Sequence, residues 1–426
     1  MIKSILMPRR KFLKTAAIAG AAVSALPVFN VRAQSAARKF KIGLVGSGGR
    51  GSGAVENMLE GAKAAGYEVE VYTVADFFPD RANGFAQKYN IPQERVFTGP
   101  LGYKQLVEQP IDIVLLATPP AFRPTHLEAA LNAGKHMFIE KPVAVDPVGA
   151  RKVMELGEVA KQKGLSVVAG TQRRHQQGYL RNQWAIANGA IGKIVGGSVS
   201  WCGGALWYKE RNNGESDASY MVRNWVSFSE MSGDHIVEQH VHNLDIANWF
   251  IGRPPESALG FGSRVRRKTG NQFDFFSLDL NYGEGVHIHS MCRQVNGTDG
   301  DVSEMFHGTE GIAYGGGKIQ SAKLASLNVP EFKTHDNPYV EEHIALLDSI
   351  AKGQPINAAR TVAESTLTAI MGRISAYTGR FVRWSDLTTN KQSPYYNLTL
   401  SPSPADFEND KVVAPTDNVW PVPGEA

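Results

Sequence analysis

The residue types best suited to chemistry lie in one short segment near the middle of the chain, where Glu238, His242 and Asp245 follow one another at helical spacing. Asp234 is placed to cap the start of a helix there. A spacing of four then puts Glu238 one turn below His242, so that the carboxylate can orient the imidazole or raise its pKa. Imidazole takes a proton from a hydroxyl group near neutral pH. The segment therefore predicts His242 as a general base, with Glu238 and Lys141 positioning a substrate hydroxyl.

Two other interpretations of this helix stay open. A metal site would recruit His235 and His240 together with His242 and Glu238. His240 and His242 are two residues apart and lie on different helix faces, and no Cys or H-E-x-x-H pattern supports such a site, so we expect no metal. In the other interpretation, these are polar helix residues whose hydrogen bonds are satisfied by their neighbours.

A second chemical element is a glycine-rich turn that follows an apolar run starting at Phe40. The turn consists of Gly46, Ser47, Gly48, Gly49, Arg50 and Gly51. Its G-x-G-x-x-G spacing allows a sharp turn, brings the backbone close to a pyrophosphate and lets the next helix pack tightly on the strand. The N-terminus of that helix offers unpaired N–H groups to the phosphates. We therefore expect a bound dinucleotide here.

Asp76 follows the next apolar strand, residues 68–75, and narrows this expectation. A carboxylate at that place accepts hydrogen bonds from both hydroxyl groups of the adenosine ribose, and it repels a 2′-phosphate. The sequence therefore favours NAD over NADP as the cofactor, although NADP stays possible.

The elements that must position these groups alternate as in a doubly wound α/β domain. Further strands are expected over 111–117, 136–139 and 166–169, with helices over 124–133 and 148–163. The loops that follow two of these strands lie at the carboxyl edge of the sheet, where dinucleotides bind. They add Thr118, Pro119, Glu140 and Lys141 to the predicted cofactor residues, and the helix after the first loop adds His126.

A second domain is expected after residue 170, because about 390 residues exceed the comfortable size of one core. Runs rich in Val, Ser and Trp at 196–202, 259–265, 273–282 and 286–292 predict a large, mostly antiparallel sheet. Two helices follow, over 337–351 and 361–377. After Leu387 the composition shifts to Ser, Pro, Asn and Asp, so residues 388–426 are expected to form an extended arm.

The glycine turn, a strand that ends in Ala-Thr-Pro-Pro, and the run His-Met-Phe-Ile-Glu-Lys-Pro about twenty residues later together resemble the Gfo/Idh/MocA family of glucose–fructose oxidoreductases and inositol dehydrogenases. The resemblance implies an α/β fold with an N-terminal Rossmann domain (34–170) and a C-terminal α+β domain (171–387). Helices 337–377 would pack back on the Rossmann domain, and the free face of the large sheet would form a homo-oligomer contact.

The resemblance also implies roles for individual residues. Lys141 would point at the substrate hydroxyl and the nicotinamide. The family usually has Asp-x-x-x-His where this chain has Glu238 and His242, so the carboxylate arm is longer here. The predicted substrate residues combine the cleft segment after 170 with aromatic and forked polar groups that suit a sugar ring: Gln172, Arg173, Arg223, Trp225 and Asp245.

The first 33 residues resemble a twin-arginine export leader. Arg9-Arg10 precedes a weakly apolar run over 15–29, and a small-residue site allows cleavage after Ala33. Pro27 and Asn30 shorten the apolar run below the ~20 residues that span a membrane, so we expect no stable span after cleavage. The expected location is the periplasm, which has no nicotinamide pool. With an association rate constant near 10⁶ M⁻¹s⁻¹, retention for hours requires a Kd of roughly 10⁻¹⁰ M.

Charge and cysteine content narrow the function classes. The 45 basic and 41 acidic residues nearly balance, and no basic run longer than a few residues follows the leader, so we expect no nucleic-acid partner. Cys202 and Cys292 are the only cysteines, and a disulfide between them is left open.

These patterns predict an exported oxidoreductase that transfers hydride between a sugar or polyol hydroxyl and a tightly bound nicotinamide, which a second substrate resets. One alternative is an NAD-dependent glycoside hydrolase that oxidises C3 transiently, eliminates the aglycone, adds water and reduces the ring again. A second alternative is a sugar-binding relative without catalytic activity.

Overall fold

The computed structural model describes residues 38–417, 419 and 422. The predicted export leader, with its cleavage position at Ala33, lies outside these residues. Within the described part of the chain, no helix combines the length and the apolar character that a membrane crossing requires.

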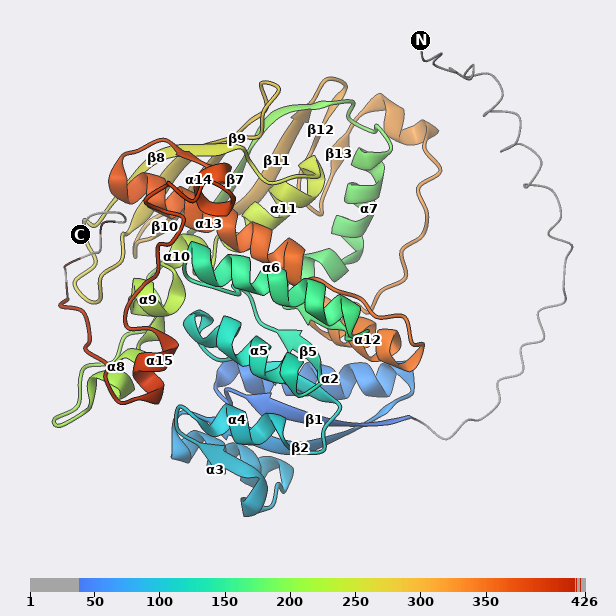
Figure 1. Ribbon diagram of the computed structural model, residues 1–426. Coiled ribbons are helices and arrows are strands. Elements are labelled where there is room, and N and C mark those ends of the chain that lie inside the picture. The colour runs from blue at the N-terminus through green and yellow to red at the C-terminus, as the bar shows by residue number, and fades with distance from the viewer. Residues whose placement is uncertain (1–37, 418, 420–421, 423–426) are drawn as a thin grey trace, which may run out of the picture. The chain divides into compact units, whose positions relative to one another are not determined.

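The N-terminal half forms a six-stranded parallel sheet in the order β3-β2-β1-β4-β5-β6 (Figure 1). The strands are β1 (Lys39–Val45), β2 (Glu68–Asp76), β3 (Val96–Thr98), β4 (Ile113–Leu116), β5 (His136–Ile139) and β6 (Val167–Ala169). The central strands are short apolar runs, and β4 is buried at every position, as strands covered on both faces must be. The strand order reverses between β1 and β4, which leaves a crevice for a ligand at their carboxyl ends.

Helices connect the parallel strands. They are α2 (Gly49–Ala65), α3 (Pro79–Tyr89), α4 (Gly102–Val107), α5 (Arg123–Asn132) and α6 (Pro147–Gln162). The predicted doubly wound α/β domain is therefore confirmed. Asp146 caps α6 by accepting a hydrogen bond from the backbone N–H of Gly149.

The C-terminal half is built on an eight-stranded sheet in the order β13-β12-β11-β7-β10-β9-β8-β14. Its strands are β7 (Ile194–Gly203), β8 (Ser257–Ser263), β9 (Phe275–Asn281), β10 (His287–Gln294), β11 (Asp301–Gly308), β12 (Gly311–Ala313), β13 (Ile319–Gln320) and β14 (Val382–Arg383). The β10–β7 pair is parallel, and the other pairs in this sheet are antiparallel. This confirms the predicted, mostly antiparallel second sheet.

Helices of the second half are α7 (Gln177–Ala187), α8 (Asp217–Arg223), α9 (Ser229–Ser232), α10 (His235–Glu238), α11 (Val241–Ile251), α12 (Pro338–Ala351), α13 (Ala359–Thr378), α14 (Trp384–Thr388) and α15 (Pro404–Glu408). Apolar residues of α11 and α13 share one core with one face of the large sheet. On other strand positions, apolar side chains stay exposed: Leu259, Phe261, Met291 and Val302.

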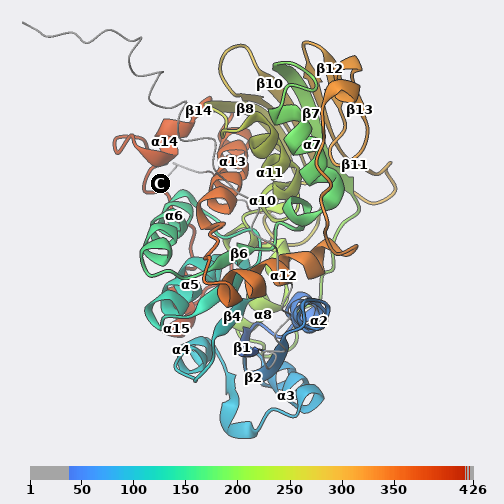
Figure 2. The same ribbon diagram turned by 90° about the vertical axis from the view of Figure 1, so that its right-hand side faces the viewer.

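Two late helices pack against the first half of the chain (Figure 2). Leu346 and Leu347 of α12 belong to the same core cluster as Ile42 of β1 and Met58 of α2. Val362 of α13 belongs to the core around α6. The parallel sheet is therefore completed by residues that lie some three hundred positions later in the chain.

The two cysteines are both free and buried. They lie on the neighbouring strands β7 and β10, where Cys292 is paired with Trp201 and Cys202 with Arg293. Because side chains alternate between the faces of a sheet, the two thiols point to opposite faces. The disulfide left open by the sequence does not form.

Candidate active site

The glycine turn joins β1 to α2 with close backbone packing. Gly46 has a φ of +95°, a left-handed conformation that favours glycine. A Cβ atom on Gly51 would lie 1.8 Å from the carbonyl oxygen of Gly46, so a side chain there would break the turn. At Gly49 the space is open, and Gly48 caps α2 without a side-chain hydrogen bond. The start of the helix therefore presents free backbone N–H groups to an anion.

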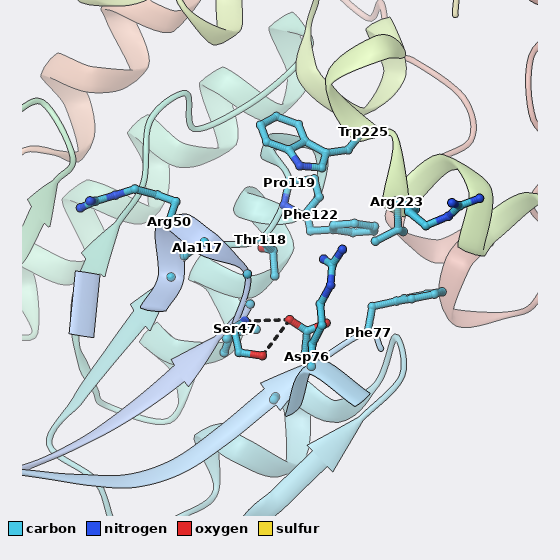
Figure 3. Close-up of a pocket in the computed structure, with 18 of the residues that line it drawn as sticks. Ser47, Arg50, Asp76, Phe77, Ala117, Thr118, Pro119, Phe122, Arg223 and Trp225 are labelled. Atoms are coloured by element: carbon cyan, nitrogen blue, oxygen red, sulfur yellow. Dashed lines mark hydrogen bonds between the residues drawn. The ribbon is translucent and has the colours of Figure 1, made fainter. Parts of the chain in front are cut away.

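A cavity of about 720 Å³ lies over this turn (Figure 3). The predicted cofactor residues that line it are Gly46, Ser47, Gly48, Gly49, Arg50, Gly51, Asp76, Thr118, Pro119 and His126. The excursion between β7 and α11, residues 204–240, forms the opposite wall and contributes Trp207, Lys209, Arg223 and Trp225. Arg223 and Trp225, predicted for the substrate, thus line the cofactor cavity. The open glycine backbone and the carboxylate of Asp76 beside it fit a dinucleotide.

Asp76 is fixed at the end of β2 by three hydrogen bonds. One carboxylate oxygen accepts from the backbone N–H of Ser47 at 2.7 Å and from its hydroxyl at 3.1 Å. The other oxygen accepts from the backbone N–H of Phe78 at 2.9 Å. The side chain is held at the cavity wall, as expected for a group that binds ribose hydroxyls. Arg81 lines the same cavity and stacks on the ring of Phe78 at 4.7 Å.

His126 belongs to an aromatic wall of the cavity. Its ring lies 4.2 Å from the ring of Tyr103 and 5.7 Å from that of Phe122, and its Nδ1 lies 3.1 Å from the hydroxyl of Thr118. Burial, together with the nearby charge of Arg123, lowers the pKa of His126 to about 3, so the imidazole is neutral. Tyr103 and Phe122 carry no motif that would mark them as cofactor residues in the sequence.

Glu140 and Lys141, the predicted cofactor residues that follow β5, are not among the residues that line that cavity. The ammonium group of Lys141 donates to the backbone carbonyl of Glu238 at 2.5 Å and to its carboxylate at 3.1 Å. The second carboxylate oxygen of Glu238 is buried without a partner. The structure therefore brings two of the predicted catalytic side chains into contact and leaves one buried acceptor free for a ligand.

His242 is buried, with 8% of its surface exposed, and its ring stacks on Trp201 at 5.7 Å. Burial lowers its pKa well below the ordinary value, and the charges of Lys141 and Arg173 lower it further. Of the two effects expected of Glu238, which were to orient the imidazole or to raise its pKa, the rise is wrong: burial and the nearby cations lower this pKa, and Glu238 is paired with Lys141. The expected continuous helix is also interrupted, since α10 ends at Glu238 and α11 begins at Val241. The imidazole is thus held in the form that accepts a proton.

Two arginines that follow β6 are each paired with a carboxylate. Arg173 pairs with Glu304, which also accepts a hydrogen bond from Asn243 at 2.8 Å. Arg174 donates two hydrogen bonds to Asp245, at 2.8 and 2.9 Å, and Ser365 donates a third at 2.7 Å. The carboxylate of Asp245, predicted to touch the substrate, is therefore already engaged by protein groups. Glu304, on β11, is a site carboxylate that no sequence motif revealed.

Arg50 of the glycine turn is tied to the predicted residue Glu140 by an ion pair. Its guanidinium also lies 3.6 Å from the fully buried carboxyl of Glu342 on α12, and over the ring of Tyr339 at 4.9 Å. Gln172, a predicted substrate residue, donates to the hydroxyl of Tyr339 at 3.1 Å. Sequence reasoning missed Glu342, because an isolated Glu in an amphipathic helix carries no signal of burial.

The remaining histidines of the segment separate. His235 bonds to Asp234, which caps α10, and His240 bonds to Ser290 at 2.8 Å. Among the residues that the structure describes, no group of three or more His, Cys, Asp and Glu side chains could hold a metal ion.

Comparisons with known proteins agree with this geometry. The family described as "Oxidoreductase family, NAD-binding Rossmann fold" (GFO_IDH_MocA) matches residues 40–171, and the GFO/IDH/MocA C-terminal domain matches residues 179–314. Inositol 2-dehydrogenase of Rubrobacter xylanophilus is 28% identical over 236 residues, 54% of this chain and 58% of that protein. The 2,7-anhydro-N-acetylneuraminate hydratase of Escherichia coli is 25% identical over 223 residues, 49% of this chain and 56% of that protein. The chain therefore spans a little over half the length of these relatives.

Solved structures share the fold at low identity. The aldose-aldose oxidoreductase from Caulobacter crescentus, complexed with glycerol, superposes with a TM-score of 0.62 at 17% identity, covering 81% of this chain and all of that one (100%). GenD2 from gentamicin A biosynthesis, in complex with NAD, gives a TM-score of 0.64 at 16% identity, covering 84% of this chain and 99% of the other. Both halves of the chain thus follow one known architecture.

Proposed function

Because this chain belongs to the GFO/IDH/MocA oxidoreductase family, with its NAD-binding Rossmann fold, we propose that it oxidises a hydroxyl-bearing carbon of a sugar or polyol. The observation that carries the proposal is the buried, unprotonated His242, which lies within electrostatic reach of the Lys141–Glu238 ion pair. Beside a nicotinamide, such an oxidation uses a base for the hydroxyl proton, and a neighbouring cation stabilises the charge on the substrate oxygen.

In this mechanism, NAD bound over the glycine turn supplies the acceptor for the hydride that leaves carbon. Lys141 donates a hydrogen bond to the substrate oxygen and stabilises the negative charge that develops there. His242 takes the hydroxyl proton, so that the products are a carbonyl compound and an imidazolium. Burial and, after it, the charges of Lys141 and Arg173 keep the pKa of His242 low, and both therefore favour release of that proton to water or to the next reactant.

The unpartnered oxygen of Glu238 accepts a hydrogen bond from a neighbouring hydroxyl of the substrate. This contact discriminates polyols from simple alcohols, because an alcohol without the second hydroxyl leaves a buried carboxylate oxygen unpaired. The ring of Trp201, stacked beside His242, offers an apolar face to the carbons of a sugar ring.

We extend the proposal to location and retention. Residues 1–33 act as a twin-arginine leader, NAD is loaded before export, and a second carbonyl substrate reoxidises it while it stays bound. The cavity supports retention, since groups from both halves of the chain wall it. The exposed Leu259, Phe261, Met291 and Val302 support a homo-oligomer formed through the open face of the large sheet.

The test uses mature protein that has been dialysed and then mixed with a panel of sugars and glycosides while nicotinamide absorbance is followed. We expect one sugar to reduce the bound cofactor and a second carbonyl compound to reoxidise it. His242→Ala and Lys141→Ala should lose at least 10²-fold in the rate of reduction. His289→Ala, an exposed histidine on β10 that bonds to Ser277, is the matched control and should keep the wild-type rate.

Other outcomes would overturn the proposal. Release of an aglycone without net change in nicotinamide absorbance assigns the glycoside hydrolase instead. If sugars bind but none of them reduces the cofactor, the protein is a sugar-binding relative without catalytic activity. Full activity of both His242→Ala and Lys141→Ala would remove the catalytic assignment.

A further inference from the structure

The aromatic wall of the cofactor cavity is supported from behind by a part of the predicted arm 388–426. From here on, the C-terminal arm means residues 398–417 only. Tyr103 and Phe122 line the cavity, each with its ring against His126, and both are largely buried. Behind them lies α15, a short helix that the arm contributes and that the capping residues Ser403 and Asp406 hold in place. The arm is thus in contact with residues that face the cofactor.

Two adjacent side chains of α15 make these contacts. The ring of Phe407, 3% exposed, meets the ring of Phe122 edge to face at 5.0 Å. The carboxylate of Glu408 accepts a hydrogen bond from the hydroxyl of Tyr103 at 2.7 Å and pairs with Lys104 at 2.7 Å. Each of the two wall residues therefore has its own partner on α15.

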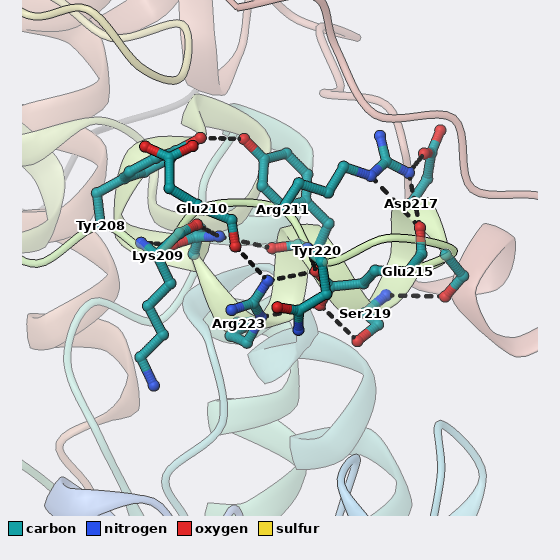
Figure 4. A network of polar contacts seen from close by, with 12 residues as sticks. Tyr208, Lys209, Glu210, Arg211, Glu215, Asp217, Ser219, Tyr220 and Arg223 are labelled. Atoms are coloured by element: carbon teal, nitrogen blue, oxygen red, sulfur yellow. Dashed lines mark hydrogen bonds and ion pairs between the residues drawn. The ribbon is translucent and has the colours of Figure 1, made fainter.

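The same arm also fixes the opposite wall of the cavity. The backbone N–H of Ala414 donates to the carboxylate of Asp217 at 2.8 Å, at the start of α8. Asp217 pairs with Arg211, and near it Glu215 pairs with Arg223, whose side chain lines the cavity (Figure 4). The excursion is thus held by a polar network, and the arm joins this network to the Rossmann half.

Closer to its start, the arm is anchored to the Rossmann half a second time. The backbone N–H of Leu400 donates to Asp146 at 3.1 Å, and Leu400 packs against the apolar cluster that contains Phe122 and Phe407. Because the arm is bonded both to the Rossmann half and to the excursion that forms the opposite wall, it limits how far the two walls can separate.

We propose that Phe407 and Glu408 are positioning residues of the cofactor site, and that the C-terminal arm sets the lifetime of bound NAD. The inference rests on NAD occupying the cavity over the glycine turn. When the walls are held together, the nucleotide leaves only after the arm yields. Loss of one contact then acts on the dissociation rate rather than on the association rate, as is usual for changes within one interface.

The experiment measures dissociation of NADH from the full mature chain, in the absence of any sugar, by displacement with excess NAD and the decay of nicotinamide fluorescence. Phe407→Ala and Glu408→Ala should each raise the dissociation rate about ten-fold, as expected for loss of one aromatic pair or one charged hydrogen bond. The conservative changes Phe407→Tyr and Glu408→Gln should return most of the wild-type rate, because the ring and the acceptor oxygen remain.

Tyr396→Ala is the matched control. Tyr396 lies just before the arm and stacks with Arg151 of α6 at 3.8 Å, away from the cavity, so its loss should leave NADH dissociation unchanged. An unchanged rate of NADH dissociation in Glu408→Ala would overturn the inference. This variant keeps the buried Phe407, so it tests the inference even if Phe407→Ala does not fold. An equal increase in Tyr396→Ala would overturn it too, by making the effect one of general loosening.

Failure of this inference and failure of the proposed function are separable. A chain that binds NADH with an arm-dependent lifetime but oxidises no sugar would support the arm and refute the oxidoreductase. If the protein oxidises sugars but the α15 variants leave the lifetime of bound NADH unchanged, the oxidoreductase is supported and the role of the arm is refuted.

Discussion

Replacing Asp76 by Asn is expected to remove most of the preference for NAD over NADP. The carboxylate is held in place by the backbone N–H groups of Ser47 and Phe78 and is only 6% exposed, so it cannot swing away from a 2′-phosphate. Two unit charges 4 Å apart interact by about 4 kcal/mol at an effective dielectric constant of 20. At about 1.4 kcal/mol per ten-fold, the charge is worth up to about three orders of magnitude in the ratio of the two dissociation constants.

Asn removes the charge while its carbonyl oxygen still accepts from Ser47. Its amide NH2 group then faces the backbone N–H of Phe78, and the loss of that hydrogen bond affects both cofactors and so cancels in the ratio of their dissociation constants. Asp76→Ala would add the cost of an unpaired buried N–H, about 1–3 kcal/mol, to the binding of both cofactors. The assay is fluorescence titration of nucleotide-free protein with NADH and with NADPH. Arg81, which lines the same cavity, remains to pair with the added phosphate.

Asp80→Asn is the control for this prediction. Asp80 lies in the first turn of α3, is exposed and does not line the cavity. The ratio of the dissociation constants should not change in this variant. A change of less than five-fold in Asp76→Asn, or an equal change in Asp80→Asn, would refute the reasoning that a fixed carboxylate selects the cofactor.

Three further predictions concern buried ionisable side chains. Burial lowers the pKa of His242, so kcat/KM should stay level down through pH 6.5, and a histidine inflection there would contradict the assignment. Burial and the Glu140 carboxylate raise the pKa of Glu342; the folded protein therefore loses stability as pH rises from about 4.3 toward that value. Thermal unfolding should show Glu342→Gln gaining on wild type as pH rises, and a constant gap would argue against a buried acid. Asp245→Asn should cost about 3–5 kcal/mol in urea unfolding by stranding Arg174, whereas a raised KM with unchanged stability would make Asp245 a substrate residue.

The dinucleotide half is predictable from the sequence because its signals are local. The glycine turn and Asp76 each sit at the end of a strand whose apolar run marks it, and a parallel sheet brings such ends to one edge. The second sheet is predictable in kind from its strand-forming runs. Its order is not, because strand pairing depends on contacts between distant segments.

The side-chain partners in the site are not predictable, since they join segments far apart in the chain. Glu238 is paired with Lys141, 97 positions away, rather than with His242, only four away. The reason is the break between α10, which ends at Glu238, and α11, which begins at Val241. The spacing of apolar residues does not reveal this break, because apolar residues occur on every side of the segment. The contact between α15 and the aromatic wall is not predictable from the sequence either, because Phe407 lies in a segment with few periodic apolar residues.

The position of α15 bears on how the protein is made. Ribosomes release the chain from its N-terminus, so the glycine turn emerges well before Phe407 and Glu408. The rear support of the aromatic wall is therefore absent throughout most of synthesis, and a nascent Rossmann half presents the nucleotide site without it. On the proposal above, a nucleotide that binds before α15 has folded dissociates faster than one that binds to the folded protein.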